Sequence, residues 1–122
     1  MTLIEIRALL KAREFDKALV AVNSCLEACP DNFHLWNLRG DLIQLQDSKE
    51  GLPLAEAEQS YLKSLECRPD NWESLEALAH LYDVVLPDST KANDYARRFL
   101  AEVRPSIEQM EKIVESETSQ SL

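Results

Sequence analysis

The sequence predicts an all-α protein built as a stack of antiparallel helix pairs, and two observations support this prediction. The first is composition: only two Gly and five Pro occur among 122 residues, so few positions suit tight turns between strands. The second is a phrase that occurs twice, "CPDNFHLW" at residues 29–36 and "RPDNWESL" at residues 68–75. A phrase repeated at this interval indicates helices that end and restart in a regular order.

Each copy of the phrase has the features of a boundary between two helices. Pro30 and Pro69 each end a helix, because proline disfavours the α conformation in the residue before it and cannot donate a backbone hydrogen bond. The Asp-Asn pairs that follow, at 31–32 and 70–71, offer short side-chain acceptors to the free N–H groups of the next helix. Pro105 with Ser106 resembles a third, degenerate copy.

Between these boundaries, apolar residues recur at the spacing of one helix face. They divide the chain into three repeats, at about 2–30, 31–69 and 70–105. The expected helices cover about 3–10 and 15–26, 32–46 and 54–67, and 71–86 and 89–103. The stretches "QDSKEGLP" and "LPDSTK" are predicted to be lengthened turns, with Asp88 or Ser89 capping the helix that follows the second one.

A seventh helix is expected at 106–116, and one of its stripes is apolar. That stripe consists of Ile107, Met110, Ile113 and Val114. A terminal helix that is apolar on one side suits the end of a stack, where it shields the last helix pair from solvent. The sequence therefore predicts one domain over residues 1–117, closed by a C-terminal capping helix, with residues 117–122 as a frayed tail.

The repeats resemble tetratricopeptide repeats, whose pattern is W-x2-L-G-x2-Y, then A-x3-F, then a closing P. The second repeat matches the pattern at Trp36, Gly40, Ala57, Tyr61 and Pro69, and the third at Leu78, Ala79, Tyr82 and Pro105. Arg39 and Ile43 depart from the Leu and Tyr of the pattern. The resemblance covers about residues 2–105 and implies a right-handed solenoid of three helix pairs.

The small residues of this pattern have a packing reason. Gly40, Ala57 and Ala79 are expected where two helices approach closely, so that a larger side chain would force them apart. The large aromatic residues Trp36, Tyr61 and Tyr82 are expected to fill the remaining space. These positions are interpreted as core rather than as a functional site.

The charge of the chain narrows the class of partner. A net charge of -9 argues against nucleic acid and anionic membrane surfaces, which would repel the protein, and favours a basic partner. The alternative is that the acidic surface only keeps the protein soluble. No window holds the ~18 apolar residues that a membrane span needs, and three cysteines without a C-x-x-C arrangement suit a reducing compartment. We therefore expect a cytoplasmic protein.

The sequence contains no catalytic constellation. His34 and His80 are the only histidines, and no glycine-rich phosphate loop is present, so neither an enzyme nor a bound cofactor is predicted. A metal site made from Cys25, Cys29 and Cys67 with His34 is an alternative. We favour the interpretation that these cysteines are core or helix-end thiols, and we predict no metal.

A partner-binding groove is expected on the inner helices, because the curvature of a solenoid exposes one helix layer on its inside. The candidate groove residues are Arg7, Lys11, His34, Asn37, Asp41, Gln44, Glu73, Glu76, His80 and Asp83. The sign of the charge changes along this stripe, so a partner would lay a basic portion over the carboxylates of the third repeat. An ordinary solvated helix face is the alternative.

The function expected from these features is binding of a segment of another protein. An adaptor, an assembly or secretion chaperone and an immunity protein that neutralises a toxin all fit a short, acidic helical-repeat chain. The competing class is a self-associating structural module. In that case the ends of the stack would join two copies into a homodimer, because three repeats bury little apolar surface by themselves.

Overall fold

The computed structural model describes residues 2–46 and 51–120, and all the regular structure within these ranges is helical. The elements in chain order are α1 (Leu3–Lys11), α2 (Phe15–Ala28), α3 (Phe33–Leu45), α4 (Leu54–Cys67), α5 (Trp72–His80), the short π-helical segment η1 (Leu81–Val85) and α6 (Ser89–Gln120). The predicted all-α class is confirmed. The predicted lengthened turn "QDSKEGLP" falls partly on residues 47–50, outside the described residues.

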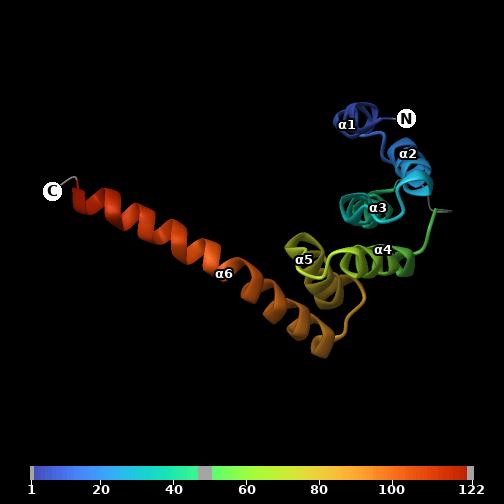
Figure 1. Cartoon of the computed structure of the whole chain (residues 1–122). Coiled ribbons are helices and arrows are strands. Elements are labelled where there is room, and N and C mark those ends of the chain that lie inside the picture. The colour runs from blue at the N-terminus through green and yellow to red at the C-terminus, as the bar shows by residue number, and fades with distance from the viewer. Residues whose placement is uncertain (1, 47–50, 121–122) are drawn as a thin grey trace.

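The main contacts between helices join elements that are neighbours in the chain, so α1 to α5 form a stack to which the start of α6 is added (Figure 1). The division into repeats at 2–30, 31–69 and 70–105, and the right-handed course of the stack, stay predictions. In the part of the chain that the structure describes, no helix combines the length and the apolar character needed to cross a membrane.

The repeated Pro-Asp-Asn phrase begins a helix in both places, and the asparagine is the residue that caps it. Asn32 Oδ1 accepts a hydrogen bond from the Leu35 backbone N–H at 3.1 Å, and Asn71 Oδ1 accepts one from Ser74 at 3.3 Å. Each bond satisfies one of the N–H groups that a helix start leaves without a partner. At the start of α6, the cap is Asp88.

Asn71 is also the centre of a buried polar network. Its Nδ2 donates to Ser64 Oγ at 2.6 Å and to Ser74 Oγ at 2.8 Å. Ser64 Oγ donates in turn to the Phe33 carbonyl at 2.7 Å, and Ser74 Oγ donates to Asn37 Oδ1 at 2.8 Å. The network joins α3, α4 and α5, so the second copy of the phrase fixes how three helices sit against one another.

Gly40 lies where α3 and α4 pack closely against each other. A Cβ atom added to Gly40 would lie 2.5 Å from Cε1 of Tyr61, whose side chain is fully buried. Ala57 is also fully buried. The packing reason proposed for the small residues therefore applies at Gly40, where glycine makes room for the aromatic ring.

Arg39, which departs from the leucine of the repeat pattern, joins three helices. Its Nε donates to Asn23 Oδ1 on α2 at 2.8 Å, and one terminal nitrogen donates to Ser60 Oγ on α4 at 2.6 Å. The other terminal nitrogen lies 3.4 Å from the Glu56 carboxylate. A largely buried guanidinium is tolerated here because its donors are satisfied.

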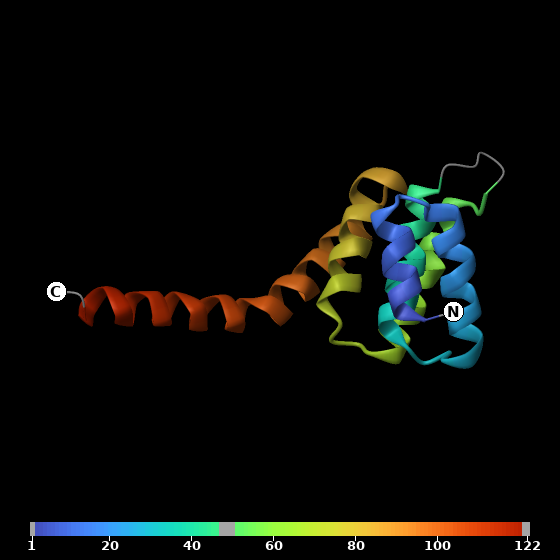
Figure 2. The same cartoon turned by 90° about the horizontal axis from the view of Figure 1, so that it is seen from above.

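The predicted break between a helix ending at 103 and a capping helix at 106–116 is wrong. Helix α6 runs without interruption from Ser89 to Gln120, with Pro105 inside it. Proline removes one backbone donor, but good helix formers flank it on both sides, so the helix bends part-way along rather than ending (Figure 2). The helix also includes residues 117–120 of the predicted frayed tail, whereas 121–122 lie outside the described residues.

The prediction that residues 106–116 shield the stack is also wrong. This part of α6 runs away from the other helices in both views (Figures 1 and 2). The first part of α6 covers the stack instead: Tyr95 and Phe99 pack against the core, and the Phe99 ring lies 6.2 Å from that of Trp72. The first part of α6, which is the second helix of the third repeat, therefore covers the end of the stack. The rest of α6 projects from it.

Candidate partner-binding groove

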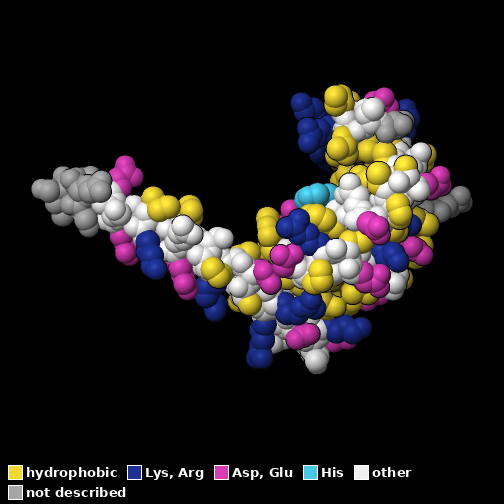
Figure 3. Space-filling model, viewed as in Figure 1, with side chains coloured by type: hydrophobic (Ala, Val, Ile, Leu, Met, Phe, Trp, Pro, Cys, Tyr) yellow, Lys and Arg dark blue, Asp and Glu magenta, His cyan; other side chains and the backbone are white. Residues whose placement is uncertain are grey.

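A groove opens on the concave side of the stack, between α3 on one wall and α5 with η1 on the other. Its volume is about 490 Å³. The space-filling view shows the hollowed side between α1 and α6, with basic side chains gathered over α1 at one end (Figure 3). Helix α4 contributes Tyr61 to the groove lining. We call this surface the acidic groove, for the carboxylates described below.

Six of the ten residues expected in the groove do line it: Asn37, Asp41, Gln44, Glu73, Glu76 and His80. The other four, Arg7, Lys11, His34 and Asp83, are exposed but are not among its lining residues. In place of Asp83, the neighbouring Val84 and Val85 of η1 line the groove. The π-helical turn changes which residues of this segment face inward, and helical spacing in the sequence does not reveal it.

A hydrogen-bonded trio lies on the α3 wall. The Tyr61 hydroxyl donates to Asp41 Oδ1 at 2.6 Å and accepts from Gln44 Nε2 at 2.7 Å. Burial raises the pKa of Tyr61 well above its ordinary value, with Asp41 adding to the effect. The hydroxyl therefore keeps its proton and fixes the position of the carboxylate. The repeat pattern predicts Tyr61 only as a core residue, and its polar role depends on residues of another helix.

Three carboxylates face the acidic groove: Asp41 from α3, and Glu73 and Glu76 from α5. Burial raises the pKa of Asp41, the hydrogen bond from Tyr61 lowers it, and the negative charge of Glu73 raises it further. The net direction is upward, so the ionised form of Asp41 is held at a cost in free energy. A cation placed between Asp41 and Glu73 would offset that cost.

Apolar side chains line the groove together with these carboxylates. Trp72 is 48% exposed and Val84 is 71% exposed, and both line the groove with the less exposed Leu81 and Val85. None of the ten residues predicted for the groove is an apolar anchor, and Trp72, directly after the Asn71 cap, is in sequence only the first residue of a helix. The signal that could have found it is its large aromatic side chain on the first turn of an inner helix.

Two predicted site residues make contacts within the stack. Asn37 is buried, and its Oδ1 already accepts the hydrogen bond from Ser74. His34 lies against the ring of Phe33, with centroids 3.9 Å apart. Across residues 2–46 and 51–120, no group of three or more His, Cys, Asp or Glu side chains is placed to hold a metal ion.

Comparison with known families identifies one part of the chain. Residues 60–98 match the family model described as tetratricopeptide repeat. The matched stretch includes α5, η1 and the covering part of α6, and thus one wall of the acidic groove. A search of curated proteins finds no match. The resemblance is confirmed for residues 60–98 and stays a prediction for residues 2–59 and 99–105. Such repeats indicate a protein–protein interaction module, and the family is typically non-enzymatic.

Proposed function

We propose that this chain, which carries a tetratricopeptide repeat at residues 60–98, binds a basic, partly apolar segment of another protein in its acidic groove. One observation carries the proposal: Asp41, Glu73 and Glu76 converge from two helices on a groove that also exposes Trp72 and Val84. Carboxylates beside an exposed aromatic ring suit Lys or Arg side chains that have apolar neighbours.

The two kinds of side chain would contribute differently. The carboxylates would speed association and select a basic segment, because charge complementarity acts mainly on the encounter and on the choice of partner. Trp72 would supply much of the affinity, since large aromatic side chains that become covered dominate binding energy. A cation beside Asp41 would also offset the burial and the repulsion from Glu73 that raise the pKa of that carboxyl group.

The direction of the bound segment follows from the ends of the concave side. Arg7 and Lys11 are exposed on α1, away from the carboxylates. An acidic end of the partner would lie toward α1 and its basic end over α5. The proposal includes no catalytic step and no cofactor. It fits an adaptor, an assembly or secretion chaperone, or a toxin-neutralising immunity protein acting in the cytoplasm.

The test compares two synthetic probes, a peptide of alternating Lys and Leu and its counterpart with Glu in place of Lys. Calorimetry should show binding of the first peptide and none of the second. The Glu73→Lys, Glu76→Lys double variant should weaken binding of the basic peptide by roughly tenfold or more, the effect of about 1.4 kcal/mol. Its association rate should also lose most of its dependence on salt.

The matched control is the Glu102→Lys, Glu108→Lys double variant, which changes net charge equally at exposed positions of α6. It should bind the basic peptide nearly as well as the unmodified chain. An equal loss in both variants would mean that only the overall negative charge attracts the peptide, and the groove would then not be the binding surface. Trp72→Ala should weaken binding without altering its salt dependence.

A further inference from the structure

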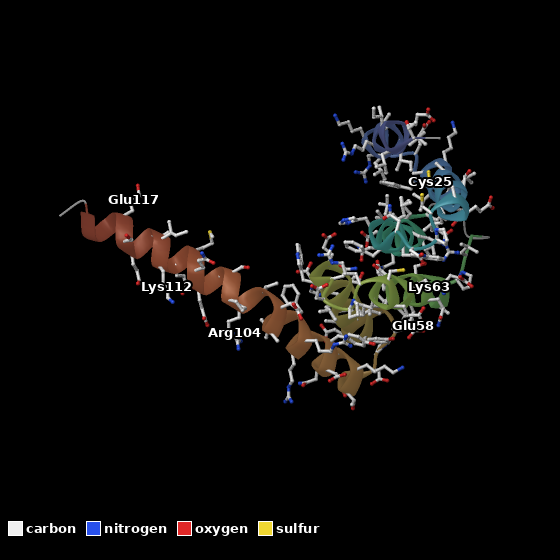
Figure 4. All side chains as sticks on the ribbon, in the orientation of Figure 1. Cys25, Glu58, Lys63, Arg104, Lys112 and Glu117 are labelled. Carbon is white, nitrogen blue, oxygen red and sulfur yellow. The ribbon has the colours of Figure 1, made fainter. Side chains whose placement is uncertain are left out.

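The projecting part of α6, residues 100–120, carries an apolar stripe, most of which the stack leaves in solvent. Ile107, Met110 and Ile113 are 50%, 56% and 52% exposed, and Val114 is 62% exposed. Figure 3 shows hydrophobic side chains on one edge of this helix, with an acidic side chain near its end, and most of the charged side chains along the other edge. In Figure 4, Lys112 and Glu117 extend from opposite sides of the helix. Several large apolar side chains exposed side by side on a projecting helix indicate an interaction surface.

The spacing of the stripe indicates what kind of surface covers it. Its positions alternate by three and four residues: Leu100, Val103, Ile107, Met110 and Val114. This alternation is the a/d pattern of helices that pack side by side along their length. Pro105 falls on the face opposite to the stripe, where it would not interfere with a second helix. The occupant that fits is therefore another helix with the same pattern.

The charges beside the stripe select a second copy of this chain in antiparallel orientation. Arg104 and Glu111 both occupy e positions of the pattern, seven residues apart. If two copies pair antiparallel around an axis between Ile107 and Met110, Ile107 of each copy packs on Met110 of the other. The same register places Arg104 of each copy beside Glu111 of the other, which forms two opposite-charge contacts.

The parallel orientation lacks this complementarity. With two copies in parallel register, Glu117 at a d position would face Glu117 of the second copy, and Arg104 would not meet Glu111. Antiparallel pairing also leaves room for the rest of the protein. Each stack lies at the N-terminal end of its own α6 (Figure 1), so the two stacks would lie at opposite ends of the paired helices.

We propose that the projecting part of α6 is a dimerisation helix, and that two copies of this chain pair antiparallel through Val103, Ile107, Met110 and Val114. This inference does not depend on the acidic groove. The contact spans about two heptads, so the dimer is weak and depends on concentration. Because each copy brings its own groove, the dimer would hold a partner with two basic segments more tightly than a monomer could.

The first test is sedimentation equilibrium of the full chain over a dilution series. The unmodified chain should show a reversible monomer–dimer equilibrium. Ile107→Ser should weaken it by roughly tenfold or more, because it removes a central apolar contact from both halves of the interface. The control Val20→Ser changes a side chain that is 70% exposed on α2 and should leave the equilibrium unchanged. Circular dichroism checks that both variants keep their helicity.

The second test decides the orientation by exchanging the charges. Arg104→Glu alone and Glu111→Arg alone should each weaken the homodimer, because each places like charges together twice. An equimolar mixture of these two variants should form heterodimers as well as the unmodified chain forms homodimers. The double variant with both changes should also recover the homodimer. Glu108→Arg, away from the interface, is the control and should have little effect.

Several results would overturn the proposal. A chain that stays monomeric at the highest concentrations would exclude a dimerisation helix. A dimer that Ile107→Ser does not weaken would have its interface elsewhere, for example at the ends of the stack. A dimer that is sensitive to Ile107→Ser but gains no heterodimer from the mixed charge variants would exclude the antiparallel register.

Discussion

The stack and the projecting part of α6 share one amphipathic pattern and differ in what covers it. Leu78 on α5 is 0% exposed, whereas Ile113 on α6 is 52% exposed, although each lies on the apolar stripe of its helix. Helical periodicity therefore identifies a helix face that needs to be covered, but it does not identify the helix that covers it. In the stack, the next helix of the same chain is the partner.

The two regions also differ in how specifically their contacts are shaped. In the stack, Gly40 accommodates the ring of Tyr61, and Asn71 links three helices through buried hydrogen bonds. Among residues 100–117, the stripe includes neither a glycine nor a buried polar group, and charged residues border it. Contacts like those of Gly40 and Asn71 fit only one packing of the helices in the stack. A regular apolar stripe with charged borders instead suits packing against a helix from another molecule.

The largest expected difference comes from removing apolar side chains in the two regions. Leu78→Ala should lower the free energy of unfolding by about 2–5 kcal/mol, because it leaves a cavity in the core. Ile113→Ala should change it by less than about 0.5 kcal/mol in dilute solution, because the side chain is already in water. Urea unfolding of both variants measures this. A large loss for Ile113→Ala would mean that the stripe packs on the stack in solution.

The next effect concerns added volume. Gly40→Leu should cost about 1–3 kcal/mol or more, because the new side chain would overlap the ring of Tyr61. Gln109→Leu adds a leucine to an exposed position of α6 and should leave the urea midpoint nearly unchanged. Equal midpoints for the two variants would contradict the close approach of α3 and α4 on which the contrast between the regions depends.

A smaller difference in stability is expected between cap variants in the two copies of the repeated phrase. Asn32→Ala removes a helix cap and should cost about 1 kcal/mol. Asn71→Ala removes a cap and also the hydrogen bonds to Ser64 and Ser74, so it should cost roughly 1 kcal/mol more. Thermal unfolding of the two variants gives the comparison. A larger loss of stability for Asn32→Ala than for Asn71→Ala would mean that the buried network does not stabilise the stack.

The smallest expected effect has the opposite sign and concerns Asp41. Because its pKa is raised in the folded state, the folded protein holds this proton more tightly than the unfolded chain. Stability from this group is fully present below the unfolded pKa and is lost as the pH rises through the folded pKa. Asp41→Asn, which can still accept from Tyr61, should therefore raise the thermal midpoint slightly at pH 7 and not at low pH.

The same variant should weaken binding of the basic peptide, so that stability and binding change in opposite directions. Glu108→Gln in the projecting part of α6 is the matched control, and it should change neither the midpoint nor the binding. A lower midpoint for Asp41→Asn at pH 7 would show that its ionised carboxylate stabilises the stack, contrary to the direction of its pKa.

The sequence alone determined the features that depend on neighbouring residues. It predicted the all-α class, the helix starts at Asn32 and Asn71, and the tight packing of Gly40, because capping, turn chemistry and helical spacing act over a few residues. It also placed Asp41, Gln44, Glu73 and Glu76 on the face that lines the groove, since a helix face follows directly from spacing.

The tertiary structure alone decided which groups meet and where α6 goes. The hydroxyl of Tyr61 reaches Asp41 and Gln44 from another helix, and Asn37 is turned inward to Ser74. Whether α6 continues through Pro105 depends on a balance between the disruption by proline and the good helix formers on both sides. The apolar stripe is compatible both with one continuous helix and with two separate helices. Contacts between distant residues are set by packing of the whole chain, and helical spacing within one segment does not contain that information.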